Sequence, residues 1–206
     1  MNQYLTSLFD TVGIDIKHLK NEYLSRAELE CLNSILKSEQ DLERDFYTSD
    51  HGENLECLLF FLRAHKTDVL DLMRGEREAK TLVELYTSST ISANYDCFRF
   101  NLTAFPQTYI PRNKIIILYR IGRTGECADN LGCSWSRSID GLRVFSDASG
   151  ISNTTLKDKP MFTITINDSQ VLFEGVEREH ELVLKPGFSY ITLTMLNDEV
   201  RKQIGR

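Results

Sequence analysis

The run Lys114-Ile115-Ile116-Ile117-Leu118-Tyr119-Arg120 decides the fold class, because it is a continuous apolar segment that ends on a cation. A run of this length and composition is typical of a buried β-strand. The strand pattern continues at residues 161–166, 171–173, 181–184 and 188–195. We therefore expect the second half of the chain to form a mostly antiparallel sheet.

The first half of the chain has the periodicity of helices instead. Residues 1–90 contain no Pro and only three Gly. Ser25 and Glu28 form a capping-box pattern before one apolar stripe. Asp50 precedes a second stripe and is expected to cap a second helix. This half is therefore predicted to be helical.

The boundary between the two patterns is placed near residue 110. Pro106 and Pro111 interrupt the chain there, just before the strands begin. The sequence thus predicts an α+β protein, with a helical region over residues 1–110 and a sheet core over residues 111–206. Because a small helical segment is marginally stable alone, we expect it to pack against the core and frame one side of a cleft.

Composition excludes several classes of protein. The 206 residues are 41% hydrophobic, which is enough to build a core. The formal net charge of −6 gives no overall attraction for nucleic acid. No apolar run approaches the roughly 20 residues that span a bilayer, and the N-terminus does not resemble a signal peptide. We expect a soluble cytoplasmic protein with no membrane partner.

Two carboxylates lie close together near the C-terminus, in Glu177-Arg178-Glu179-His180-Glu181-Leu182-Val183-Leu184. Side chains two residues apart on a strand share a face, so Glu179 and Glu181 are expected to point the same way. Leu182 and Leu184 would anchor the opposite face in the core. Because two like charges on one face are destabilising, this arrangement indicates a reaction centre. The charged residues beside the two carboxylates are expected to be solvated.

Two further polar groups precede these carboxylates. Arg120 ends the first predicted strand, where a cation either binds an anion or pairs with a carboxylate. Gly132-Cys133-Ser134-Trp135-Ser136 then places two hydroxyls on one face of a short strand, with Trp135 towards the core. An arginine, a serine pair and a Glu-X-Glu in this order form a candidate catalytic constellation.

This order of motifs resembles the catalytic core of the mono-ADP-ribosyltransferase family, in the branch with Arg, Ser-X-Ser and Glu-X-Glu motifs. The resemblance covers residues 114–195, about two-fifths of the chain. The Gly-X-Ser-Trp-Ser form is especially similar to the Gly-X-Ser-Trp-Thr of bacterial and phage members, the toxin and effector type. The resemblance implies a split β-sheet core, NAD as the substrate and no metal.

The resemblance implies that Glu181 is the catalytic carboxylate. Positive charge develops on the ribose of NAD as nicotinamide leaves, and a fixed carboxylate beside it favours that transition state. Ser134 would orient Glu181 or the nicotinamide ribose, and Glu179 occupies the position that activates the acceptor nucleophile. The implied acceptor is a macromolecule, with protein arginine as the first choice and nucleic acid as the second. An inhibitor or antitoxin is a further implied partner.

The resemblance also assigns residues to NAD binding. Arg120 would bind a phosphate of NAD, and Arg123 is the alternative ligand for that phosphate. Ser134 would contact the ribose, and Ser136 would support the strand that carries Ser134. Phe145 would either stack on the nicotinamide ring or pack in the core.

The same residues also fit roles without chemistry. Arg120 would then pair with Glu181 at the end of the sheet, and Ser134 and Ser136 would form the solvated face of an edge strand. Two other functions stay open beside the transferase. One is a binding module that keeps the fold without turnover, and the other is an NAD glycohydrolase in which water is the acceptor.

Overall fold

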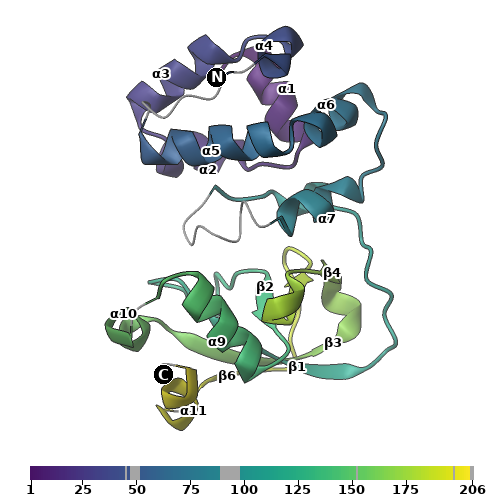
Figure 1. Cartoon of the computed structure of the whole chain (residues 1–206). Coiled ribbons are helices and arrows are strands. Elements are labelled where there is room, and N and C mark those ends of the chain that lie inside the picture. The colour runs from purple at the N-terminus through teal and green to yellow at the C-terminus, as the bar shows by residue number, and fades with distance from the viewer. Residues whose placement is uncertain (45, 47–51, 89–97, 152, 197, 205–206) are drawn as a thin grey trace. The chain divides into compact units, whose positions relative to one another are not determined.

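The computed structural model describes residues 1–44, 46, 52–88, 98–151, 153–196 and 198–204. The chain divides into two compact units, Met1–Phe105 and Pro106–Arg206, and each unit is described by itself (Figure 1). This division lies near the boundary predicted at residue 110. That the helical region frames a cleft in the core stays a prediction.

The first unit is built from helices. Its elements are α1 (Gln3–Thr11), α2 (Ile16–His18), the π-helical η1 (Leu19–Tyr23), α3 (Arg26–Ile35), α4 (Glu39–Glu43), α5 (Glu53–Ala64), α6 (Lys66–Arg74), α7 (Thr81–Tyr86) and the 3-10 helix η2 (Leu102–Ala104). Ser25 Oγ accepts a hydrogen bond from Glu28 N at 3.3 Å, and the Glu28 carboxylate accepts one from Ser25 N at 2.8 Å. The predicted capping box is therefore confirmed. Glu28 Oε1 also accepts a hydrogen bond from Leu55 N at 3.0 Å, which ties α3 to α5.

Leucine and phenylalanine side chains from these helices form one buried cluster. Leu8 of α1, Leu32 of α3 and Leu58 of α5 have no exposed surface. Burying a side chain of this kind contributes about 2 kcal/mol, so the first unit has a hydrophobic core of its own. Asp50, the predicted cap of the second helix, lies outside the described residues.

The second unit contains the sheet. Its elements are β1 (Ile115–Ile121), β2 (Ser134–Ser136), α9 (Ile139–Ala148), α10 (Asn153–Asp158), β3 (Met161–Asn167), η3 (Asp168–Gln170), β4 (Val171–Glu174), η4 (Glu177–Glu179), β5 (Glu181–Leu184), β6 (Thr192–Met195) and α11 (Asp198–Ile204). The strand order is β4-β5-β2-β1-β3-β6, and every strand pair among the described residues is antiparallel. The predicted α+β class is therefore confirmed. Tyr119 and Ser136 form the pair that joins β1 to β2, so two halves of the sheet meet at a narrow seam.

Strand alternation gives this sheet two faces with different cover. One face carries Trp135 and Leu182, which are buried together in one apolar cluster. The opposite face carries Ile121 and Met161, which form a second cluster with Leu142 of α9. Because α9 contacts both β1 and β2, it covers the sheet at the seam between its halves (Figure 1).

The prediction of a buried strand at residues 114–120 is wrong for the first part of β1. Ile115 is 57% exposed and Ile117 is 52% exposed. β3 pairs with the whole length of β1, but β2 pairs with β1 only at Tyr119. α9 packs near Ile121, at the C-terminal end of β1, and so leaves the first residues of β1 uncovered. The apolar run therefore reflects strand propensity rather than burial at these two isoleucines.

The strand predicted at residues 188–195 is also too long, because β6 covers only its second half. Phe188 N donates to Lys185 O at 3.0 Å, which closes a turn. Ser189 N donates to Gln170 Oε1 at 3.0 Å. These two hydrogen bonds hold the start of the segment outside the ladder with β3. By contrast, β3, β4 and β5 form where the sequence predicts them.

Asp168 fixes the start of β1 and offers a test of this part of the fold. It is 1% exposed, and its carboxylate accepts hydrogen bonds from Arg112 N at 2.8 Å and Lys114 N at 3.1 Å. Asp168→Ala removes both acceptors, so we expect the free energy of unfolding to fall by about 2 to 3 kcal/mol. Asp129→Ala, at an exposed carboxylate, is the control and should change it by less than about 0.5 kcal/mol. Denaturation followed by the fluorescence of Trp135, the single tryptophan, measures both variants, and equal effects would contradict the role of Asp168.

Candidate active site

A pocket lies between the sheet and α9. Its walls include all of the residues that the sequence predicts for the site: Arg120, Ser134, Ser136, Phe145, Glu179 and Glu181. These residues come from β1, β2, α9, η4 and β5, so no single segment of the chain defines the pocket. The structure thus brings the three motifs together around one space.

Glu181 is held firmly within the pocket. It begins β5, lies opposite Ser136 of β2 and is 7% exposed. Its Oε1 accepts a short hydrogen bond of 2.5 Å from Ser134 Oγ. Its Oε2 accepts a hydrogen bond of 2.8 Å from Val176 N. Each carboxylate oxygen therefore has a fixed donor, and the carboxylate has a defined orientation.

The loop between β4 and β5 is shaped around this carboxylate. Gly175 N donates to Glu181 O at 3.0 Å, and Glu181 N donates to Val176 O at 3.2 Å. A Cβ atom at position 175 would overlap with Glu181 Oε2. Glycine is therefore required here because the loop backbone approaches the carboxylate closely, and not because of an unusual φ.

Glu179 reaches the same pocket by a route that differs from the prediction. It lies in η4, and His180 follows in the left-handed region with φ of 49°, so Glu179 and Glu181 do not share a strand face. The expectation of two carboxylates on one strand is therefore wrong. β2 and the residue after it hold the turn, since Ser136 Oγ donates to Glu179 O at 2.8 Å and Arg137 N donates to His180 O at 2.9 Å. α9 packs against η4.

The carboxyl group of Glu179 is electrostatically unusual. Glu179 is 8% exposed, and burial together with the nearby charge of Glu181 raises its pKa from 4.5 to about 7. Arg178 opposes this rise only weakly, because its Nε lies 3.8 Å from Glu179 Oε1. At neutral pH both protonation states of Glu179 are therefore populated, which suits a group that takes up and releases protons.

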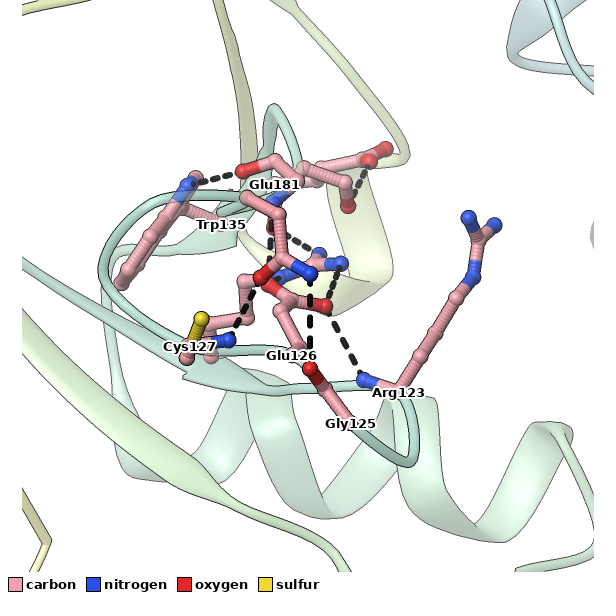
Figure 2. A network of polar contacts seen from close by, with 10 residues as sticks. Arg123, Gly125, Glu126, Cys127, Trp135 and Glu181 are labelled. Atoms are coloured by element: carbon pink, nitrogen blue, oxygen red, sulfur yellow. Dashed lines mark hydrogen bonds and ion pairs between the residues drawn. The ribbon is translucent and has the colours of Figure 1, made fainter.

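Arg120 has a partner that the sequence did not predict. Its Nε donates to Glu126 Oε1 at 2.6 Å and its Nη2 donates to Glu126 Oε2 at 2.9 Å (Figure 2). Its Nη1 donates to the backbone oxygen of Ser134 at 2.6 Å. Of the two roles considered for this cation, the structure shows pairing with a carboxylate, and the partner is Glu126 rather than Glu181. A phosphate at Arg120 would have to compete with that carboxylate.

Glu126 lies in the segment that joins β1 to β2, and its side chain is 5% exposed. Burial alone would raise its pKa, but Arg120 and the N–H groups of Gly132 and Arg123 keep the pKa below its ordinary value. The side chain of Arg123, the alternative phosphate ligand, extends away from this network (Figure 2). The sequence prediction missed Glu126. A chemical signal could have found it, because an arginine at the end of a buried strand needs a carboxylate, and the segment between β1 and β2 contains Glu126 and Asp129 as its acidic residues.

Ser136 and Phe145 complete the lining. Ser136 is 5% exposed and lies on an interior strand of the sheet, so the alternative of a solvated edge strand is wrong. Its Oγ also accepts a hydrogen bond from Ser138 N at 3.2 Å, next to the start of α9. Phe145 packs in the cluster of α9 and at the same time lines the pocket, so the two roles considered for it are compatible.

Among the residues that the structure describes, no group of three or more His, Cys, Asp or Glu side chains is arranged to hold a metal ion. No helix within the same ranges has the length and apolar character needed to cross a membrane.

Comparisons of the chain with protein-family models, curated proteins and solved structures give no match. The resemblance to mono-ADP-ribosyltransferases thus rests on the three motifs. A function has to be inferred from the chemistry that the pocket supports.

Proposed function

We propose that this protein is an NAD-dependent mono-ADP-ribosyltransferase, which cleaves the bond between nicotinamide and ribose and transfers ADP-ribose to a macromolecule. The observation that carries the proposal is the carboxylate of Glu181, which Ser134 Oγ and Val176 N hold in one orientation inside the pocket. Its place in the order Arg120, Ser134, Glu181 agrees with the family's motifs. The type of sheet core implied by the family is part of the same proposal.

The reaction gives such a carboxylate a defined task. The glycosidic C–N bond breaks, nicotinamide leaves with the electron pair, and positive charge develops on the ribose. The ionised Glu181 stabilises that charge more strongly in the transition state than in the ground state. Because its two oxygens already have donors, little reorganisation is needed when the charge appears.

Glu179 supplies the second half of the reaction. The acceptor atom forms a bond to the anomeric carbon of ribose and loses a proton, and ionised Glu179 accepts that proton. A pKa of about 7 places this carboxyl near the optimum for a general base at neutral pH. Protein arginine is the acceptor proposed first, and nucleic acid is the second.

The proposal is tested with two labels on NAD, one in the nicotinamide and one in the adenylate. The protein is incubated with labelled NAD and a cell lysate, and Glu181→Ala serves as the blank. We expect free nicotinamide together with adenylate label on macromolecules. Nicotinamide without labelled macromolecules would indicate a glycohydrolase. No cleavage and no thermal shift at millimolar NAD would overturn both enzyme assignments, since a ligand that binds the native state raises its stability.

A further inference from the structure

Glu126 is a buried carboxylate for which the proposed chemistry has no direct use. Its two oxygens accept four hydrogen bonds from three residues, and Oε1 receives Arg120 Nε at 2.6 Å and Gly132 N at 2.9 Å. Oε2 receives Arg120 Nη2 at 2.9 Å and Arg123 N at 3.0 Å. A carboxylate satisfied in this way is expensive to bury and difficult to replace, so its role needs an explanation.

The contacts of Glu126 lead directly to the pocket. Glu126 binds one edge of the Arg120 guanidinium, through Nε and Nη2, and the remaining Nη1 donates to the backbone oxygen of Ser134 at 2.6 Å. Ser134 Oγ in turn donates to Glu181 Oε1. Figure 2 shows this connected series of polar contacts from Glu126 to Glu181. Ser134 is therefore tied at its backbone to Arg120 and at its side chain to the carboxylate.

The segment around Gly132 is built to admit this arrangement. A Cβ atom at position 132 would overlap with Arg120 Nη2, so the backbone approaches the guanidinium as closely as only glycine permits. Strand alternation also places the side chain of Arg120 on the sheet face opposite to Tyr119 and Ile121. The guanidinium thus approaches Ser134 from behind the strand that carries it.

We infer that Glu126 is a positioning residue, which acts through Arg120 to hold Ser134, and thereby Glu181, in the catalytic orientation. The inference rests on the proposed function. The ion pair also neutralises the charge of Arg120 within the protein, so Arg120 serves the geometry of Ser134 rather than the diphosphate of NAD. The two roles of Arg120 differ in their kinetic consequences, because positioning affects kcat whereas phosphate binding affects KM.

The test is Glu126→Gln, measured as nicotinamide release over a range of NAD concentrations. This variant keeps the shape of the side chain and removes its charge. We expect kcat to fall by about 10- to 100-fold, as for a small misplacement of reacting groups, with KM for NAD changed by less than about threefold. Glu126→Asp, which keeps the charge, should restore part of kcat. Asp129→Asn, at an exposed carboxylate of the same segment, is the matched control.

A double-mutant cycle with Ser134→Ala separates positioning from general loss of structure. If Glu126 acts through Ser134, Glu126→Gln should lower kcat little further once the hydroxyl of Ser134 is absent. Glu126→Asp replaces Glu126→Gln in the cycle if the latter does not fold. Additive losses, or a KM that falls because Arg120 has been released to bind phosphate, would overturn the inference. A wild-type protein that releases no nicotinamide would overturn the proposed function and this inference together. A Glu126→Gln variant with the wild-type kcat would overturn the inference alone.

Discussion

Glu181→Gln is expected to lower the rate of nicotinamide release at saturating NAD by about a thousandfold. Glutamine has the size of glutamate, and its amide oxygen can still accept a hydrogen bond from Val176 N or Ser134 Oγ. The substitution therefore removes the negative charge with little change of shape. Because that charge acts on the transition state, kcat should fall while KM for NAD changes little.

The measurement is the initial rate of nicotinamide release, with circular dichroism to verify the fold of the variant. Glu177→Gln, at an exposed carboxylate near the same loop, is the control and should keep the wild-type rate. Gly175→Ala tests the position of the charge separately, since its methyl group would displace Glu181 Oε2 without removing the charge. A Glu181→Gln variant that retains a third or more of the wild-type rate would contradict the assigned role of Glu181.

Local patterns in the sequence are sufficient for much of the fold. The capping box of Ser25 and Glu28 forms as predicted because both partners lie within one helical turn. The strands at β3, β4 and β5 form as predicted because apolar residues set their faces. The exposure of Ile115 and Ile117 was not predictable in this way, since it depends on how far β2 and α9 extend along β1.

The candidate site was predicted in composition but not in geometry. Arg120, Ser134 and Glu181 carry the motifs, and the structure gathers them around one pocket. Local spacing predicts a strand position for Glu179, because the left-handed turn at the next residue depends on contacts with β2 and α9, which are distant in the sequence. No sequence spacing predicts the role of Glu126. Its ion pair with Arg120 forms only when the segment between β1 and β2 folds back onto the sheet.

Glu179→Gln is expected to reduce transfer to a macromolecule by about 10²- to 10⁴-fold, while nicotinamide release into water falls much less. Glutamine cannot accept the proton of the acceptor, but cleavage of the glycosidic bond relies on Glu181. In the wild-type protein, transfer should rise with pH through about 7 as Glu179 ionises. The variant should show no such rise. Equal loss of transfer and of nicotinamide release would contradict the separate roles that are proposed for Glu179 and Glu181.

Glu179→Gln, which lowers transfer activity, is expected to raise the stability of the protein above neutral pH. The pKa of Glu179 is raised from 4.5 to about 7, so between these pH values the native protein holds a proton that the unfolded chain has lost. The stability that Glu179 contributes is complete below pH 4.5 and is lost as pH rises through about 7, by up to about 3 kcal/mol. Glu179→Gln has no proton to lose, so it should unfold at higher denaturant concentration than the wild type at pH 8, and the difference should shrink towards pH 5. Glu177→Gln is the control and should show no such pH dependence. A Glu179→Gln variant that is less stable than the wild type at pH 8 would contradict the raised pKa of Glu179.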